Sequence, residues 1–513
     1  MKTISLAMIL MLGLFTVAYA QVVQPERVEI ELSDTEDDFI VVSADEQGII
    51  IFREVDTDIK LKGKIAWEFI KFNTSLEKEW NKLFGIDFSH QLIGYDYENG
   101  QLVLLYRNGP YYDRNMTLIN MGINSGDTTV HHIKRIVPIV LSYFEIVGQT
   151  VVLGGEVNYK PAVMHYDLLT RKAKVLPGIY GDRGELLDIQ PNDQDQTLDV
   201  LMAEMLDDKR VTVNIKAFDQ YSNLLQDVPL QPRPKTNLLD AQVSAFDGEK
   251  QNVAGTYGPR RSKYSRGLFF ATITPDGQQQ IEYYNYGDLD NFFGYMKPKR
   301  ENRVKERITR RKAKGKKIKV NYRVIVHELM ADKGKYIMLA EAYYPRYNNG
   351  YYRYYGSYGS PYFNDLYFDG YRYTHAVVVC FDERGNLMWD HSFKLDNAKS
   401  MELEQLVQVN MQKDNVVLMY SYEGEIKTKV VDKVGKIVEE NFNNPIKLAN
   451  EYDELRNKRD SEIDGIEKWY DHYFFIHGIQ KIRNLEDRGV DFTRKVFFIN
   501  KVAYQNDKVV FNK

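Results

Sequence analysis

Residues 72–86 read FNTSLEKEWNKLFGI, and residues 381–395 read FDERGNLMWDHSFKL. Phe, Trp, Phe and the final aliphatic residue stand at the same positions in both stretches. The likeness continues upstream, where residues 45–54 and 332–341 each enclose an apolar run between Asp and Glu in the same register. A further apolar run matches downstream, so the similarity covers about 60 residues and indicates an internal repeat.

Other windows share a looser pattern of short apolar strands separated by turns. Residues 267–273 form one such strand, Pro275-Asp276-Gly277 follows, and a second strand is expected at residues 280–284. Pro presets the first angle of a turn and Gly accepts a positive φ, so this spacing predicts an all-β fold. Units of about 50 residues are expected where nothing is inserted. They start near Phe39, Gln91, Val140, Leu186, Leu239, Arg323 and Leu403, with a remnant near Tyr470.

A unit of this size corresponds to four short strands, which is one blade of a β-propeller. A four-stranded sheet cannot bury its own faces, whereas sheets stacked around a ring bury both. We therefore expect a propeller of about seven four-stranded blades, with eight blades as the alternative count and a pair of packed β-sandwiches as the rival fold. The strand at residues 28–32 is expected to close the ring by pairing with a C-terminal strand such as residues 496–499.

The composition is that of an ordinary globular protein, with 513 residues, a net charge of −4 and 43% apolar residues. Near-neutral charge argues against nucleic acid as a partner. Residues 1–20 combine Lys2, an apolar stretch and an Ala-Tyr-Ala site, which predicts a signal peptide cleaved before Gln21. The expected product is one propeller domain over residues 21–513 without a membrane span, exported to the periplasm or cell surface.

A basic segment interrupts the repeat at residues 288–322. Residues 297–319 contain 13 Lys or Arg and only two Glu. We expect a partly helical, solvated projection, because four cations fall at helical spacing. These candidate anion-binding residues are Arg303, Arg307, Arg310 and Lys314. Acidic glycans, an acidic partner or an anionic membrane surface would suit them, and a merely solvated charged loop is the alternative.

A second insertion, at residues 343–373, contains 12 Tyr. Tyr offers a flat apolar face with a polar tip, so a Tyr-rich loop suits contact with a protein or a sugar. The alternative is that it folds back over its own blade. The candidate binding residues are Tyr347, Tyr351, Tyr352, Tyr354, Tyr355 and Tyr358. A third departure, at residues 447–468, is expected to be a charged helical connector.

Motifs for known catalytic chemistry and for cofactors were sought and not found in the sequence. Asp390-His391-Ser392 has the residue types of a catalytic triad, but neighbours on a strand point to opposite faces. The single cysteine, Cys380, lies in an apolar run and is expected to be an inert core thiol. We expect no cofactor.

The nearest approach to a metal site has oxygen ligands at the spacing of a calcium-binding loop. Its members are Asp193, Asp195, Asp199 and Glu204, with Thr197 between them. Leu198 stands where such a loop needs Gly for its sharp turn, so a polar hairpin is the alternative.

The leader, the Phe-x7-Trp-x3-Phe repeat and the run GLFFATITPDG at residues 267–277 resemble exported propeller-like proteins of Bacteroidetes bacteria. This resemblance implies a cell-envelope location and a role in binding or scaffolding, and it transfers no catalytic residue. The sequence thus favours a non-enzymatic binding protein whose ligand is an envelope protein or a glycan. The alternatives are a carbohydrate-active hydrolase or lyase that uses carboxylates of the central channel, and a structural envelope component.

Overall fold

The computed structural model describes residues 21–33, 39–55, 64–109, 115–134, 137–181, 184–192, 195–246, 248–350, 365–457, 460–484, 486 and 491–505. The predicted signal peptide, residues 1–20, lies outside them. Within this part of the chain, no helix is both long and apolar enough to cross a bilayer.

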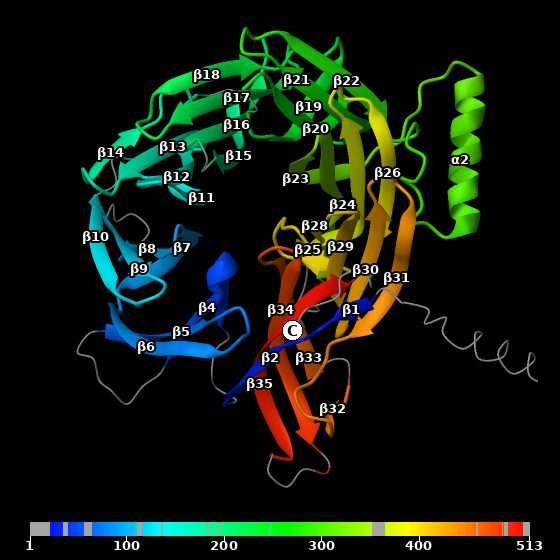
Figure 1. Ribbon diagram of the computed structural model, residues 1–513. Coiled ribbons are helices and arrows are strands. Elements are labelled where there is room, and N and C mark those ends of the chain that lie inside the picture. Colours follow the sequence, from blue (N-terminus) through cyan, green and yellow to red (C-terminus); the bar gives the residue numbers. More distant parts are fainter. Residues whose placement is uncertain are drawn as a thin grey trace, which may run out of the picture.

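Eight antiparallel sheets follow one another around a ring, and each contributes one blade of a β-propeller (Figure 1). The propeller expected from the sequence is confirmed, and its rival, a pair of sandwiches, is wrong. The number of blades is eight, which was the alternative to the preferred seven.

Blades 1 to 4 contain four strands each. Blade 1 consists of β3 (Ile40–Ser43), β4 (Ile49–Val55), β5 (Lys64–Phe72) and β6 (Lys78–Asp87), with a 3-10 turn, η1 (Asp45–Gln47), between β3 and β4. Blade 2 consists of β7 (His90–Glu98), β8 (Gln101–Asn108), β9 (Asn115–Gly122) and β10 (Thr128–Lys134). Blade 3 consists of β11 (Val140–Val147), β12 (Thr150–Val157), β13 (Lys160–Asp167) and β14 (Lys172–Val175). Blade 4 consists of β15 (Gly184–Asn192), β16 (Thr197–Met205), β17 (Val211–Asp219) and β18 (Leu224–Pro229).

Of the later blades, blades 6 and 8 have more than four strands. Blade 5 consists of β19 (Thr236–Val243), β20 (Gln251–Pro259), β21 (Gly267–Ile273) and β22 (Gln279–Asn285). Blade 6 consists of β23 (Arg323–Asp332), β24 (Lys335–Gly350), β25 (Asp365–Asp382), β26 (Leu387–Lys394) and the short β27 (Lys399–Ser400). Blade 7 consists of β28 (Gln408–Met411), β29 (Asn415–Tyr422), β30 (Glu425–Asp432) and β31 (Ile437–Pro445). Blade 8 consists of β33 (Ser461–Lys468), β34 (Tyr473–Asn484), β35 (Thr493–Gln505), the N-terminal β1 (Gln21–Val23) and β2 (Arg27–Leu32), and β32 (Asp453–Leu455).

Both ends of the described chain meet in blade 8, where β2 pairs antiparallel with β35. Val28 faces Ile499 and Glu31 faces Val496, so the ring closure predicted from the sequence is confirmed. Arg27 fastens the pairing, because its guanidinium lies 4.5 Å from the Phe498 ring and donates to Gln480 Oε1 at 2.8 Å. We call this pairing of β2 with β35 the clasp.

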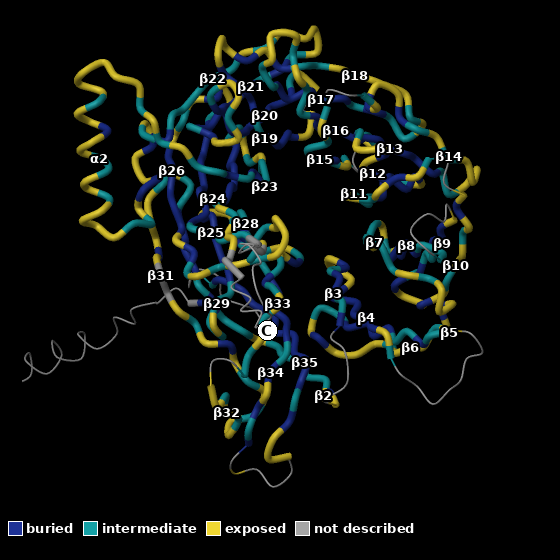
Figure 2. The backbone as a smooth tube through the Cα atoms, turned by 180° about the vertical axis from the view of Figure 1, so that it is seen from behind, coloured by how far each residue is buried: buried dark blue, intermediate teal, exposed yellow. Residues whose placement is uncertain are grey.

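The hydrophobic core lies between successive blades rather than at one centre. Ile50 and Phe52 of β4 pack with Leu104 and Tyr106 of β8, and comparable clusters join the other neighbours. Figure 2 shows buried backbone through the middle strands and exposed residues along the outer edges. Burial between sheets is therefore what holds the ring together.

The two stretches that revealed the repeat occupy equivalent places in their blades. Trp80 lies on β6 and Trp389 on β26, the fourth strands of blades 1 and 6. Each indole reaches the next blade: Trp80 Nε1 donates to the carbonyl of Ile123 at 3.0 Å, and Trp389 packs against Gly435. The repeated Trp is thus a contact between neighbouring blades.

Two expectations about the insertions are corrected. Residues 447–468 contain no helix among their described positions, and they form β32 and β33 instead. The segment at residues 343–373 is not simply a loop, because its ends extend β24 and β25 into a long antiparallel hairpin. The helical part of the basic segment is confirmed as α2 (Pro298–Ala313).

Candidate anion-binding cleft

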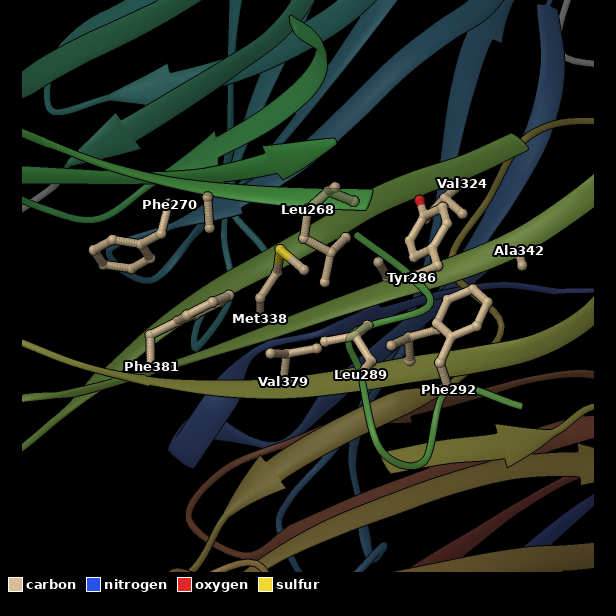
Figure 3. Close-up of a cluster of buried hydrophobic side chains, with 14 of the residues drawn as sticks. Leu268, Phe270, Tyr286, Leu289, Phe292, Val324, Met338, Ala342, Val379 and Phe381 are labelled. Atoms are coloured by element: carbon tan, nitrogen blue, oxygen red, sulfur yellow. The ribbon is translucent and has the colours of Figure 1, made fainter. Parts of the chain in front are cut away.

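The basic insertion begins with an aromatic anchor that ties it to the ring. Tyr286, Leu289 and Phe292 are buried together with Met338 and Val379 of blade 6 (Figure 3). Burying three large side chains stabilises the attachment by several kcal/mol, at roughly 1.5–3 kcal/mol each. The insertion is therefore fixed where it leaves blade 5.

Polar contacts orient the same segment along β26. The carboxylate of Asp390 accepts the backbone amides of Asp290 and Asn291, both at 2.8 Å. Ser392 Oγ donates to the carbonyl of Asn291 at 2.8 Å, whereas His391 Nε2 bonds to the carbonyl of Gly435 in blade 7. The three residues that resemble a triad thus face two different neighbours and do not form one.

Helix α2 has the signals of a stable helix at both ends. Pro298 occupies its first position and Glu301 its first turn, while Arg310, Arg311 and Lys312 occupy its last turn. This arrangement complements the helix dipole. Only Ile308 is buried, and α2 stands outside the ring beside β26 in both views (Figures 1 and 2).

The four cations predicted to bind anions all lie on α2 or at its end. Arg303, Arg307 and Arg310 are exposed on the helix, and Lys314 is its C-terminal cap. Arg310 pairs with Glu306 one turn away at 3.0 Å. Such exposed pairs contribute about 0.3–0.5 kcal/mol, so Arg310 can exchange Glu306 for another anion at little cost. The structure thus places all four cations on one exposed element.

After α2 the chain turns back and forms a cleft with blade 5. Arg311 donates through Nε and Nη2 to the carbonyl of Lys317, at 3.0 and 2.8 Å, and this fixes the returning segment. The cleft has a volume of about 740 Å³, which is within the range of ligand pockets. Its charged lining residues are Arg233, Lys235, Arg266, Asp288, Lys312, Lys316 and Lys317.

The charge of the cleft is almost wholly positive. Asp288 is its one acid and pairs with Lys312 at 2.7 Å. Among the described residues, no carboxylate lies within ion-pair distance of the remaining five cations of the lining. Like charges repel one another in such a space, so the cleft is suited to an anion that neutralises them.

Two tyrosines form the blade 5 wall of the cleft. The rings of Tyr257 and Tyr283 meet edge to face at 5.2 Å. The guanidinium of Arg233 lies 4.1 Å from the Tyr283 ring and 5.0 Å from that of Tyr257. Burial raises the pKa of Tyr283, so its hydroxyl stays neutral and accepts the backbone amide of Arg233 at 3.1 Å. One face of each ring is therefore already covered by a cation.

The sequence did not reveal the contribution of blade 5 to this cleft. Arg233 and Lys235 precede β19, while Arg266 precedes β21, and each is ordinary in its local context. The available signal was the density of cations at residues 260–266, close to the start of the insertion. Only the packing of the insertion shows that these side chains share one space.

The Tyr-rich hairpin presents a row of aromatic rings. Phe368 lies 5.7 Å from Tyr347 and 5.0 Å from Tyr371, between ring centroids. Tyr347 is 54% exposed, which agrees with its prediction as a contact residue but does not test it. The other predicted tyrosines lie outside the described residues: Tyr351, Tyr352, Tyr354, Tyr355 and Tyr358.

Carboxylates near the ring interior link neighbouring blades. Asp240 Oδ2 accepts the backbone amide of Val326 in blade 6 at 2.7 Å, and Asp188 Oδ2 accepts from Gln242 Nε2 in blade 5 at 2.9 Å. Glu341 accepts the amide of Val407 in blade 7 at 2.7 Å. Desolvation raises the pKa of Asp188, and it raises that of Asp240 to about 6. These acids are engaged in holding the ring together.

The calcium candidate is not supported. Asp193 lies outside the described residues, and Asp199 and Glu204 are five positions apart on β16, so they face opposite sides of the sheet. Asp199 instead accepts from Gln251 Nε2 at 2.8 Å, while Asp195 belongs to the turn before the strand. Across the described ranges, no three His, Cys, Asp or Glu side chains are grouped to hold a metal ion.

The cysteine prediction is confirmed. Cys380 is fully buried on β25, and burial raises the pKa of its thiol to about 11. The thiol is therefore protonated at physiological pH and unreactive.

No protein-family model matches the chain, and no curated protein matches it. Some solved structures are similar to this chain at low sequence identity. The β-propeller domain of the Trilobed protease from Pyrococcus furiosus is 9% identical, with 82% of this chain and 97% of that one covered and a TM-score of 0.38. The polysaccharide lyase Uly1 is 8% identical, with 80% and 89% covered and a TM-score of 0.37. The dihydro-heme d1 dehydrogenase NirN is 10% identical, with 94% and 78% covered and a TM-score of 0.43. At such identities and TM-scores, nothing is transferred from these structures to this chain.

Proposed function

We propose that this chain is an exported, non-enzymatic propeller of the cell envelope that binds an anionic ligand, either a protein or a glycan. The observation that carries the proposal is the cleft, formed where a fixed basic insertion meets blade 5, whose five remaining cations have no carboxylate partner among the residues that the structure describes. Export rests on the leader at residues 1–20.

Topology supports a common binding face. The end of β20, which borders the cleft, and the end of β24, which enters the Tyr-rich hairpin, are both the ends of second strands. Second strands of successive blades end on the same face of a propeller ring. A large ligand could therefore contact the cleft and the hairpin at once.

A binding assay with three polyanions tests the proposal. Purified protein is titrated with poly-L-glutamate, dextran sulfate and phosphatidylglycerol vesicles, with neutral dextran as the control. We expect binding to at least one polyanion that weakens steeply as salt is added. Failure to bind any of the three more tightly than neutral dextran would contradict the proposal.

The carbohydrate-active alternative draws on one observation. Asp240, with a pKa of about 6, lies close enough to Asp188 for their charges to interact. Two neighbouring carboxyls are what acid–base cleavage of a glycosidic bond uses. We expect no new reducing ends when the protein is incubated with polygalacturonate or chondroitin sulfate. Their appearance, and its loss in Asp240→Asn, would favour the enzyme.

A further inference from the structure

The cations of α2 are followed along the chain by cations that line the cleft, and we call the two sets together the track. Arg303, Arg307, Arg310 and Lys314 follow each other at intervals of three or four residues, which places them about 5–6 Å apart along one side of the helix. Lys314 is followed by Gly315, Lys316 and Lys317, which line the cleft. The row on the helix is thus followed along the chain by residues of the cleft lining.

The length of the track suits an extended ligand. Arg303 and Lys314 are eleven residues apart, so the helical part alone spans roughly 16 Å at 1.5 Å per residue. The cleft adds Arg233, Lys235 and Arg266 beyond the end of the helix. A compact anion would occupy the cleft and leave the helical row without a role.

The helical part of the track lacks the exposed apolar residues that binding to a membrane or to a protein partner requires. The apolar residues of α2, Val304 and Ile308, pack against the core, and no large exposed hydrophobic residue lies between residues 297 and 319. Interfacial helices need an apolar face to enter a membrane, and stable protein interfaces need apolar or aromatic anchors.

Stacking on aromatic rings is disfavoured as well. Arg233 occupies one face of each of the two tyrosines of the cleft wall, where a nucleic-acid base would otherwise stack. A hydrated chain with regularly repeated charges and few apolar groups remains as the best fit. Linear polysaccharides with a carboxylate or sulfate on successive sugars have this chemistry.

We infer that the track from α2 into the cleft binds one segment of a linear acidic polysaccharide. This inference rests on the proposed function, because it names the class of the anionic ligand. Arg233 and Arg266 line the cleft, and guanidinium groups form forked hydrogen bonds to carboxylate or sulfate. The cations of α2 hold the emerging chain by charge, without reading its sugars.

Three variants, each lacking three positive charges, test the assignment. The helix variant is Arg303→Gln/Arg307→Gln/Arg310→Gln, and the cleft variant is Lys235→Gln/Lys316→Gln/Lys317→Gln. The matched control is Lys78→Gln/Lys172→Gln/Lys413→Gln, whose exposed lysines lie on blades 1, 3 and 7. Since all three variants have the same net charge, any difference in affinity between them shows the effect of where the removed charges lie.

The measurement is fluorescence anisotropy with labelled polygalacturonate and chondroitin sulfate, each as short and long fragments. We expect both test variants to weaken binding roughly 10- to 100-fold and the control less than about threefold, with long fragments binding tighter than short ones. Unchanged melting temperatures would show that the variants fold. Equal affinities in all three variants would overturn the inference.

Competing ligands separate this inference from the broader proposal. If poly-L-glutamate or phosphatidylglycerol vesicles bind as tightly as the polysaccharides, the inference is wrong while the proposed anion-binding function stands. If none of these ligands binds, both fail. Tighter binding to the polysaccharides that depends on the helix and cleft variants supports both.

Discussion

At the scale of single residues, the ring depends on carboxylates that reach from one blade to the next. Asp240 is the clearest case, because Oδ2 accepts the amide of Val326 and Oδ1 accepts that of Ala241 at 3.0 Å. Its pKa of about 6 shows that the surroundings disfavour the charged form. The contact therefore links two blades, and its contribution to the free energy of unfolding depends on pH.

We predict that Asp240→Asn changes how stability depends on pH. Asp240 has a folded pKa of about 6, above the unfolded value near 3.9, so its contribution is present in full below about pH 4 and is lost as the pH rises through 6. The variant lacks this titration, and its amide oxygen can still accept from Val326. Urea unfolding at several pH values should show that the free energy of unfolding of the variant rises relative to that of the wild type between about pH 4 and 7.

Asp240→Ala serves as the companion variant. It leaves the amide of Val326 without its acceptor, and we expect a loss of about 1–3 kcal/mol in the free energy of unfolding. A constant difference between Asp240→Asn and the wild type across the pH range would contradict the assignment of the pKa.

At the scale of elements, the turn between the third and fourth strands has the same hydrogen bonds in blades 4, 6 and 7. Asp219, Asp382 and Asp432 each accept backbone amides two and four residues further on. Gly435 follows in one such turn with φ at +91°, and Trp389 of the previous blade packs on it. The turn thus reverses the direction of the chain and also provides a surface on which a side chain of the previous blade packs.

We predict unequal effects of one substitution at two equivalent turns. Gly277 and Gly435 occupy the same position and both have positive φ. In Gly435→Ala the new Cβ would lie 2.6 Å from Trp389, whereas in Gly277→Ala it would meet nothing within 4 Å. We expect Gly277→Ala to cost about 1–2 kcal/mol of stability from the backbone alone. Gly435→Ala should cost roughly 1–3 kcal/mol more because of overpacking. Equal losses in urea unfolding would contradict the docking role.

At the scale of the whole molecule, stability depends on closing the ring. The clasp joins β2 to β35, and Arg494 on β35 bonds to both Glu29 and Asp453, at 3.1 and 2.5 Å. Without β2, the edge of β35 would expose unpaired backbone groups. The clasp therefore supports every blade indirectly, since the blades pack in a circle.

We predict that removing the clasp weakens the entire propeller. A chain that starts at Ser33 should lose roughly 3 kcal/mol or more of stability relative to one that starts at Gln21, because Leu32 and its neighbours no longer cover β35. It should also aggregate through the open edge. Thermal unfolding and light scattering of the two chains provide the measurement, and identical behaviour would show that the clasp is dispensable.

The fold was predictable from the sequence because the same packing contact between neighbouring blades requires the same residues at the same spacing. Trp80 and Trp389 are spaced alike since both dock on the next blade. Residues 461–468 belong to the segment that was expected to be a charged helical connector, and they form a strand with a local irregularity. A bulge between Ile463 and Gly465 adds one residue to the strand, so Ile463 and Ile466 share a face at a spacing of three. That spacing imitates a helix.

The candidate site was predictable only in part. The cations of α2 are contiguous in the sequence, so their helical spacing could be recognised. The cleft brings residues 233–236 and 312–318 together, and no periodicity links segments so far apart. The preferred count of seven blades failed for a related reason, because blade 8 is assembled from both ends of the chain.

The clasp also imposes an order on assembly during synthesis. Arg27 and its partner Asn500 are 473 positions apart, so a chain made from its N-terminus completes the earlier sheets long before the final one. The first strand must wait unpaired until the last strand arrives. A premature stop in translation would leave β2 without its partner strand β35. The ring can therefore close only when the whole polypeptide has been made.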